Sequence, residues 1–181
     1  MIEAGQKAPA FSMRNQDGKV TKLGDFAGKN VVLYFYPKDD TPGCTVEACA
    51  FRDEHSKLVK KGAVVLGVSP DEEKSHQKFI KKFNLPFPLL VDDEHKAAEA
   101  FGAWGEKNMY GRKYMGIIRS TFLIGPDGVV KTAWPKVKPE GHADEVLAAL
   151  DGKAEAKAAP AAKKAKAKPA AKSAKKVKTA R

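Results

Sequence analysis

The sequence has 181 residues, of which 43% are hydrophobic, and this is enough for one domain with a buried core. Its charge is uneven, because residues 153–181 carry eleven Lys or Arg and one acid, whereas the first 152 residues carry 22 basic and 21 acidic groups. No stretch approaches the roughly 20 apolar residues of a membrane span, and the N-terminus lacks the segments of a secretory signal. We therefore expect a soluble, cytoplasmic protein.

The first half of the chain alternates strand-like runs with a helical pattern. The Asp17-Gly18 pair indicates a turn, so a short hairpin is expected around it, with residues 20–23 as the second arm. Residues 31–36 are apolar on both faces, which is typical of a central strand covered by helices. Residues 44–61 have helical spacing and end at a glycine, and residues 63–68 predict a second buried strand.

The second half begins with the clearest helix start in the chain, Ser69-Pro70-Asp71-Glu72. It combines a capping serine, a proline at the first helical position and a glutamate three residues after the cap, and it predicts a helix ending near Phe83. Further along we expect a strand at 87–91, whose prolines favour an edge or a strand entrance, a short helix at 94–101, a hairpin of 116–124 with 129–133, and a helix at 140–150.

Strands that alternate with helices, followed by a hairpin and a last helix, predict an α/β layered fold of the thioredoxin-like kind for residues 1–152. Residues 153–181 are nearly all Ala and Lys, interrupted by Pro160 and Pro169, and cannot bury enough apolar surface to offset the entropy of ordering. We expect this second region to be a disordered basic tail.

Cys44 and Cys49 are the only cysteines in the chain. The turn signal Thr41-Pro42-Gly43 directly precedes Cys44, which places this cysteine in the first turn of the expected helix. Free backbone N–H groups and the positive end of the helix dipole stabilise a thiolate at that position. In a reducing cytoplasm, such a pair favours catalysis or redox sensing over a structural disulfide.

Two other interpretations of the cysteines are weaker. Two ordinary buried cysteines are common in protein cores, but this explanation leaves the Thr-Pro-Gly approach unexplained. A zinc site would need two further ligands, and the four histidines show no paired spacing. We expect each histidine to lie on the surface or on a helix face, and we expect no metal or other cofactor. Glu47 is either a solvated helix charge or a partner of Arg119 or Arg52.

The run Pro37-x-x-x-Thr41-x-x-Cys44, together with Arg119 within residues 116–122, resembles the active-site signature of the peroxiredoxins. The second cysteine, five positions after the first, and the run Trp134-Pro135-Lys136-Val137 resemble the Q-type, or bacterioferritin-comigratory, class. The resemblance covers about residues 3–150 and leaves out the tail.

The resemblance implies a thiol peroxidase that reduces hydrogen peroxide and organic hydroperoxides. Cys44 attacks the peroxide, and the guanidinium of Arg119 stabilises the thiolate and can hold a peroxide oxygen. Thr41 bonds the peroxide, Pro37 shapes and shields the pocket, and Cys49 resolves the sulfenic acid by forming a disulfide. Thioredoxin or a glutaredoxin-like protein is the implied reductant, with no metal, haem or flavin.

Formation of a disulfide between Cys44 and Cys49 requires a conformational change in the helix that carries them. Five residues on an intact helix place two Cα atoms roughly 8 to 9 Å apart, whereas a disulfide tolerates at most about 7 Å. We therefore expect the first turns of the Cys44 helix to unwind when the Cys44–Cys49 bridge forms.

Two alternatives remain open. A general dithiol oxidoreductase would need a Cys-x-x-Cys spacing, which is absent. A nucleic-acid-associated protein, in which the tail 153–181 binds phosphates without reading sequence, fits the charge of the tail, as does a purely solubilising role. For the oligomeric state we expect a monomer.

Overall fold

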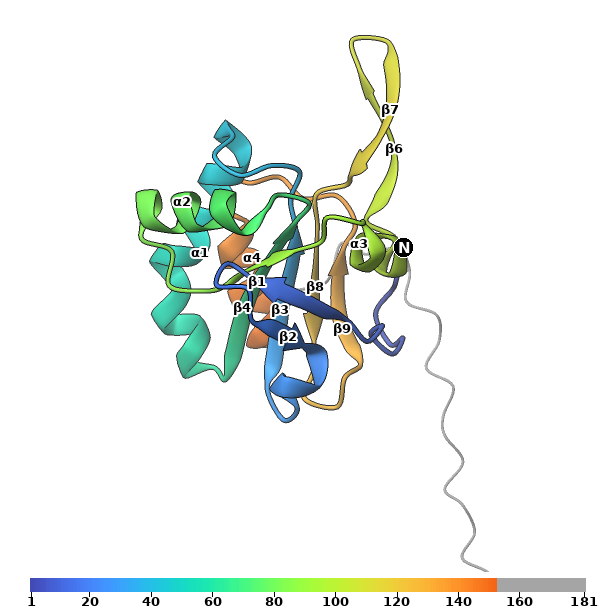
Figure 1. The fold of residues 1–181 in the computed structure, drawn as a ribbon. Coiled ribbons are helices and arrows are strands. Elements are labelled where there is room, and N and C mark those ends of the chain that lie inside the picture. Colours follow the sequence, from blue (N-terminus) through green and yellow to red (C-terminus); the bar gives the residue numbers. More distant parts are fainter. Residues whose placement is uncertain (153–181) are drawn as a thin grey trace, which may run out of the picture.

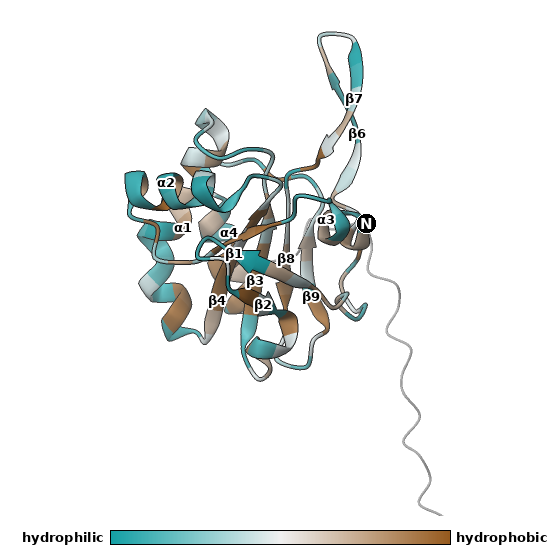
Figure 2. Ribbon diagram, in the orientation of Figure 1, coloured by the Kyte–Doolittle hydropathy of each residue, from teal (hydrophilic) through white to brown (hydrophobic). Residues whose placement is uncertain are grey.

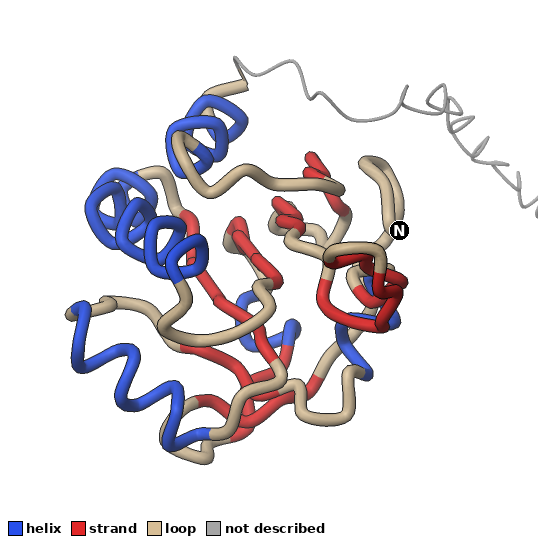
Figure 3. Tube along the Cα trace, turned by 90° about the horizontal axis from the view of Figure 1, so that it is seen from above, coloured by secondary structure: helices blue, strands red, loops and turns tan. Residues whose placement is uncertain are grey.

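The computed structural model describes residues 1–152, in which seven strands form a central sheet between helices (Figures 1 and 3). The order of strands across the sheet is β2-β1-β5-β4-β3-β8-β9. The sheet is mixed, because β3, β4 and β5 run parallel while the other strands pair antiparallel. The strands are β1 (Ser12–Asn15), β2 (Val20–Lys22), β3 (Asn30–Phe35), β4 (Ala63–Ser69), β5 (Leu89–Val91), β8 (Ser120–Ile124) and β9 (Val130–Trp134).

The centre of the sheet is built from its most apolar strands, which are brown in Figure 2. In β3 every residue after Asn30 is buried, because the strand lies between β4 and β8 and helices cover its face. Side chains alternate between the two faces of a strand, so Leu33 and Tyr34 belong to two separate core clusters.

Helices on both faces complete the layers. On the Tyr34 side, α1 (Pro42–Lys60), α2 (Glu73–Phe83) and α4 (His142–Leu150) contribute buried apolar residues to one cluster. On the Leu33 side, α3 (Lys96–Phe101) and the short 3-10 helix η1 (Leu23–Phe26) pack against the other cluster. This is the α/β layered arrangement that the sequence predicts, with the helix of Cys44 on one face of the sheet.

The predicted start of α2 was wrong. Ser69 does not cap the helix, because it is the last residue of β4 and its hydroxyl donates to the carboxylate of Asp71 at 2.8 Å. The helix begins at Glu73, after an N-cap at Glu72. The predicted end at Phe83 is confirmed, and Asn84 follows it in the left-handed conformation.

A hairpin that the sequence analysis missed projects from the body of the molecule (Figure 1). It consists of β6 (Trp104–Met109) and β7 (Arg112–Ile117), joined by Tyr110 and Gly111, which both have positive φ. The expected strand 116–124 is therefore divided between β7 and β8. The turn went unrecognised because tyrosine, rather than Asn or Asp, occupies its first position.

The remaining expected elements are present at nearby bounds. β5 lies inside the sheet between β1 and β4, so its preceding prolines mark a strand entrance and not an edge. Among residues 1–152, no helix combines the length and apolar character needed to cross a bilayer. The predicted tail, residues 153–181, lies outside the described part of the chain.

Candidate active site

Cys44 is the third residue of α1 and is buried, with 1% of its surface exposed. The helix starts here because Thr41 is the extended N-cap residue and Pro42 fits the first helical position. The Thr41 hydroxyl donates to the carbonyl of Lys38 at 2.9 Å and does not cap the helix. The N–H groups of the first turn thus donate no bond to the N-cap side chain and can stabilise a negative sulfur.

Arg119 reaches this sulfur from the segment just before β8. Arg119 directly precedes β8, whose Ser120 pairs with Phe35 at the end of β3. The segment that leads from β3 to Cys44 and the segment that contains Arg119 therefore start side by side. Arg119 Nη2 donates to Cys44 Sγ at 3.1 Å. Gly43 permits this approach, because a Cβ at that position would lie 3.2 Å from Nη2.

The other arm of the Arg119 guanidinium donates to Glu47. Nη1 lies 2.5 Å from Glu47 Oε2, and the Glu47 side chain is 0% exposed. Burial raises the pKa of Glu47 to about 7, while the charge of Arg119 opposes this rise. The second carboxyl oxygen of Glu47, Oε1, has no partner among residues 1–152. Glu47 is therefore a partner of Arg119, and not a solvated helix charge or a partner of Arg52.

The loop that leads to Cys44 is anchored at Asp39, which is 7% exposed. Its carboxylate accepts bonds from the Tyr36 hydroxyl at 2.6 Å, from Ser75 Oγ at 2.8 Å and from His76 Nδ1 at 2.7 Å. The other ring nitrogen of His76 faces the carbonyl of Leu90 at 3.0 Å. Both ring nitrogens of His76 thus face acceptors, and the ring joins the loop before α1 to β5 across α2.

No local pattern in the sequence predicts this anchor. His76 in α2 and His142 in α4 lie on helix faces, as expected, but on buried ones, since they are 0% and 1% exposed. The His142 ring bonds the Thr121 hydroxyl at 2.8 Å. In the sequence, only the position of Asp39 between Pro37 and Thr41 points to a role at the site. This position does not identify His76, 37 residues away, as the partner of Asp39.

Cys49 lies on the same uninterrupted helix and is half-buried, and both thiols are free. With α1 intact, helix geometry sets their Cα atoms roughly 8 to 9 Å apart. The structure thus brings Cys44, Arg119 and Glu47 together, with Thr41 at the helix start and Pro37 at the exit of β3, while Cys49 stays out of reach of Cys44.

Comparisons with known proteins identify the family of this chain. The model of the AhpC/TSA family matches residues 4–133. A putative peroxiredoxin bcp of Coxiella burnetii is 54% identical over 149 residues, which cover 82% of this chain and 99% of the relative. Peroxiredoxin Bcp of Bacillus subtilis is 54% identical over 154 residues, covering 85% and 98%.

Solved structures give the same result for the fold. Xanthomonas campestris peroxiredoxin Q superposes with a TM-score of 0.75 and 48% identity, covering 78% of this chain and 90% of that chain. Peroxidoxin BcpB of Mycobacterium tuberculosis superposes with a TM-score of 0.75 and 32% identity, covering 84% and 98%. The predicted thioredoxin-like fold and the predicted family are confirmed. The chain belongs to the AhpC/TSA family, as a thiol peroxidase of the Bcp, or Q-type, peroxiredoxins.

Proposed function

We propose that Cys44 is the thiolate that reduces the peroxide. The observation that carries this proposal is the double contact of Arg119, which donates to Cys44 Sγ and to buried Glu47 at once. Its guanidinium is planar and always charged, so the contact with Glu47 fixes the orientation of the arm that faces the sulfur. The helix start adds a second source of positive potential at the same atom.

The chemistry follows from a thiolate held in this way. The sulfur attacks the terminal oxygen of the hydroperoxide, the O–O bond breaks, and the alkoxide leaves as an alcohol after it takes up a proton. Cys44 becomes a sulfenic acid. In this proposal, N–H groups at the helix start stabilise charge on the breaking bond, the Thr41 hydroxyl oxygen accepts a hydrogen bond from the peroxide, and Pro37 shields the site from water.

Cys49 is the proposed resolving thiol. It attacks the sulfenic sulfur of Cys44, water leaves, and an intramolecular disulfide forms. Because the intact helix holds the two residues too far apart, the start of α1 must unwind first. A dithiol reductant, thioredoxin or a glutaredoxin-like protein, then reduces the disulfide and allows α1 to refold.

Hydrogen peroxide and small organic hydroperoxides are the proposed substrates. One structure of the Xanthomonas campestris bacterioferritin comigratory protein, 47% identical to this chain, is described in terms of alkyl peroxide reduction. We also propose that the protein acts as a monomer in the cytoplasm. The alternative in which the tail 153–181 ties the protein to nucleic acid has no support from these comparisons, and the tail lies outside the described residues.

The test is peroxide turnover with thioredoxin recycling for the wild type, Cys44→Ser and Cys49→Ser. Cys44→Ser should show no turnover. Cys49→Ser should consume one equivalent of peroxide and then stall until an external thiol is added. Full turnover by Cys44→Ser would refute the role of this sulfur.

The unwinding has its own measurement, hydrogen exchange of residues 44–52 in the reduced and oxidised protein. Protection should fall in the oxidised form, whereas protection that is the same in both forms would rule out local melting.

A further inference from the structure

The β6–β7 hairpin leads directly into the candidate active site, because Ile117 at the end of β7 is followed by one residue and then by Arg119. Its strands pair Gly105 with Gly116 and Lys107 with Tyr114. Side chains of paired residues lie on the same face of a sheet, and alternate residues share that face. One face of the hairpin therefore has a pair of glycines at its base and Lys107 beside Tyr114 above them.

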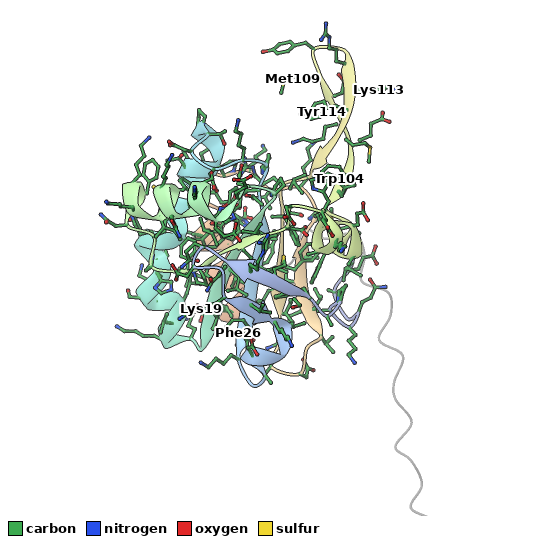
Figure 4. The ribbon with its side chains drawn as sticks, viewed as in Figure 1. Lys19, Phe26, Trp104, Met109, Lys113 and Tyr114 are labelled. Carbon is green, nitrogen blue, oxygen red and sulfur yellow. The ribbon has the colours of Figure 1, made fainter. Side chains whose placement is uncertain are left out.

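The Lys107 side chain extends over this glycine pair toward the body of the protein. Its Cδ lies 3.1 Å from the place where a Cβ of Gly116 would stand, and its Nζ lies 6.0 Å from the ring centroid of Tyr114. Lys107 is partly buried, whereas its neighbours Glu106 and Asn108 are exposed. Figure 4 shows the hairpin with Tyr114 and Lys113 beyond the body of the protein.

The charges of the candidate active site act on this ammonium group. Burial lowers the pKa of Lys107, the positive Arg119 lowers it further, and the negative form of Cys44 raises it. Among residues 1–152, Lys107 forms no ion pair with a carboxylate, whereas Lys113 on the other face pairs with Glu106 at 3.6 Å. A partly buried cation without an anionic partner is suited to bind an anion that comes from outside.

The burial of the sulfur determines where such an anion can lie. Cys44 is 1% exposed and the Arg119 side chain is 17% exposed, so only the terminal –OOH group of an organic hydroperoxide can reach the sulfur. The rest of the molecule must remain outside, next to the residues that border the site. Arg119 already bonds Glu47 and Cys44, so its remaining N–H groups face the –OOH group. Lys107, a partly buried cation without a carboxylate partner among residues 1–152, is open to a charged group of the substrate.

We propose that Lys107 is a specificity residue, which binds the carboxylate of a negatively charged organic hydroperoxide while Cys44 reduces the –OOH group at its other end. This inference rests on the proposed function of Cys44. Tyr114, on the face of Lys107, and Met109 near the hairpin tip are exposed by 40% and 56% and offer apolar contact to the carbon chain of the substrate.

The test compares matched substrates that differ only in charge. Straight-chain ω-hydroperoxy carboxylates of six, nine and twelve carbons, and their methyl esters, are reduced at pH 7.5 by the wild type, Lys107→Met, Lys107→Arg and Lys113→Met. The quantity measured is the ratio of kcat/KM for the acid to that for the ester. Because both substrates meet the same enzyme, any effect of a variant on folding or on the sulfur itself cancels in this ratio.

The wild type should prefer the acid about threefold to fivefold for at least one chain length, as expected for one partly exposed ion pair. Lys107→Met should bring the ratio close to one, Lys107→Arg should keep most of the preference, and Lys113→Met should match the wild type. An equal ratio in the wild type and Lys107→Met at every length, or an equal loss in Lys113→Met, would overturn the inference. If the wild type reduces neither these substrates nor hydrogen peroxide, the proposed function itself fails.

Discussion

Replacing Glu47 by glutamine should remove a large part of the pH dependence of folding stability. Glu47 is 0% exposed, and its pKa is raised from 4.5 to about 7, first by burial. A raised pKa means that the folded protein favours the neutral carboxyl, so the stability from this group is complete below pH 4.5 and is lost as the pH rises through about 7. Glutamine keeps an acceptor for Arg119 but does not ionise.

The size of the effect follows from the two pKa values. One pKa unit corresponds to about 1.4 kcal/mol, so between pH 5 and pH 8 Glu47 should lower the free energy of unfolding by about 2.5 kcal/mol. In Glu47→Gln, the loss of free energy of unfolding between pH 5 and pH 8 should be smaller by about this amount. Cys44→Ser is the suitable background for both proteins, because it removes the titration of the thiol, and Cys44 does not contribute to the raised pKa of Glu47.

The assay is urea unfolding at pH 5 and pH 8 for the Cys44→Ser protein with and without Glu47→Gln. Glu99→Gln, which removes an exposed carboxylate from α3, is the matched control and should leave the pH dependence unchanged. If Glu47→Gln loses as much stability as its parent between the two pH values, the carboxyl does not titrate in this range and the reasoning is wrong.

Three further substitutions test other contacts. Arg119→Lys keeps the charge but cannot bridge two partners, so the rate of peroxide reduction should fall at least tenfold while alkylation by iodoacetamide falls less; equal losses would argue against a role specific to peroxide. Asp39→Asn should destabilise the fold by about 3 kcal/mol in urea unfolding, because the buried carboxylate that accepts bonds from Tyr36, Ser75 and His76 is lost, and a change below 1 kcal/mol would mean that these bonds contribute little. Gly67→Ala should cost about 1 to 3 kcal/mol, since the new Cβ would lie 2.6 Å from Leu89 Cδ2; an unchanged midpoint would show that β4 and β5 can separate there.

The proposed specificity of Lys107 also gives the projecting hairpin a function. A two-stranded hairpin without a core of its own is only marginally stable in water. Here its base is attached to the body, where Trp104 stacks on His95 with ring centroids 3.8 Å apart. The position of Lys107 relative to the site thus depends on this attachment.

The local features of this protein follow from short stretches of its sequence. The apolar run of β3, the Thr-Pro-Gly turn and the helix that follows are encoded in neighbouring residues, because backbone preferences and hydrophobic spacing act over short distances. The position of Cys44 at a helix start was therefore predictable. The capping signal at Ser69 failed, since pairing of β4 with its neighbours extended the strand to that residue and outweighed a local preference.

Which charged side chains contact one another depends on long-range packing. Arg119 bonds Glu47 and Cys44 across 72 and 75 residues, and Asp39 meets His76 across 37 residues. Such contacts depend on strand order and register, and no local pattern records them. The burial that raises the pKa of Glu47 is likewise a property of the packed layers, because the same residue on an isolated helix would be solvated.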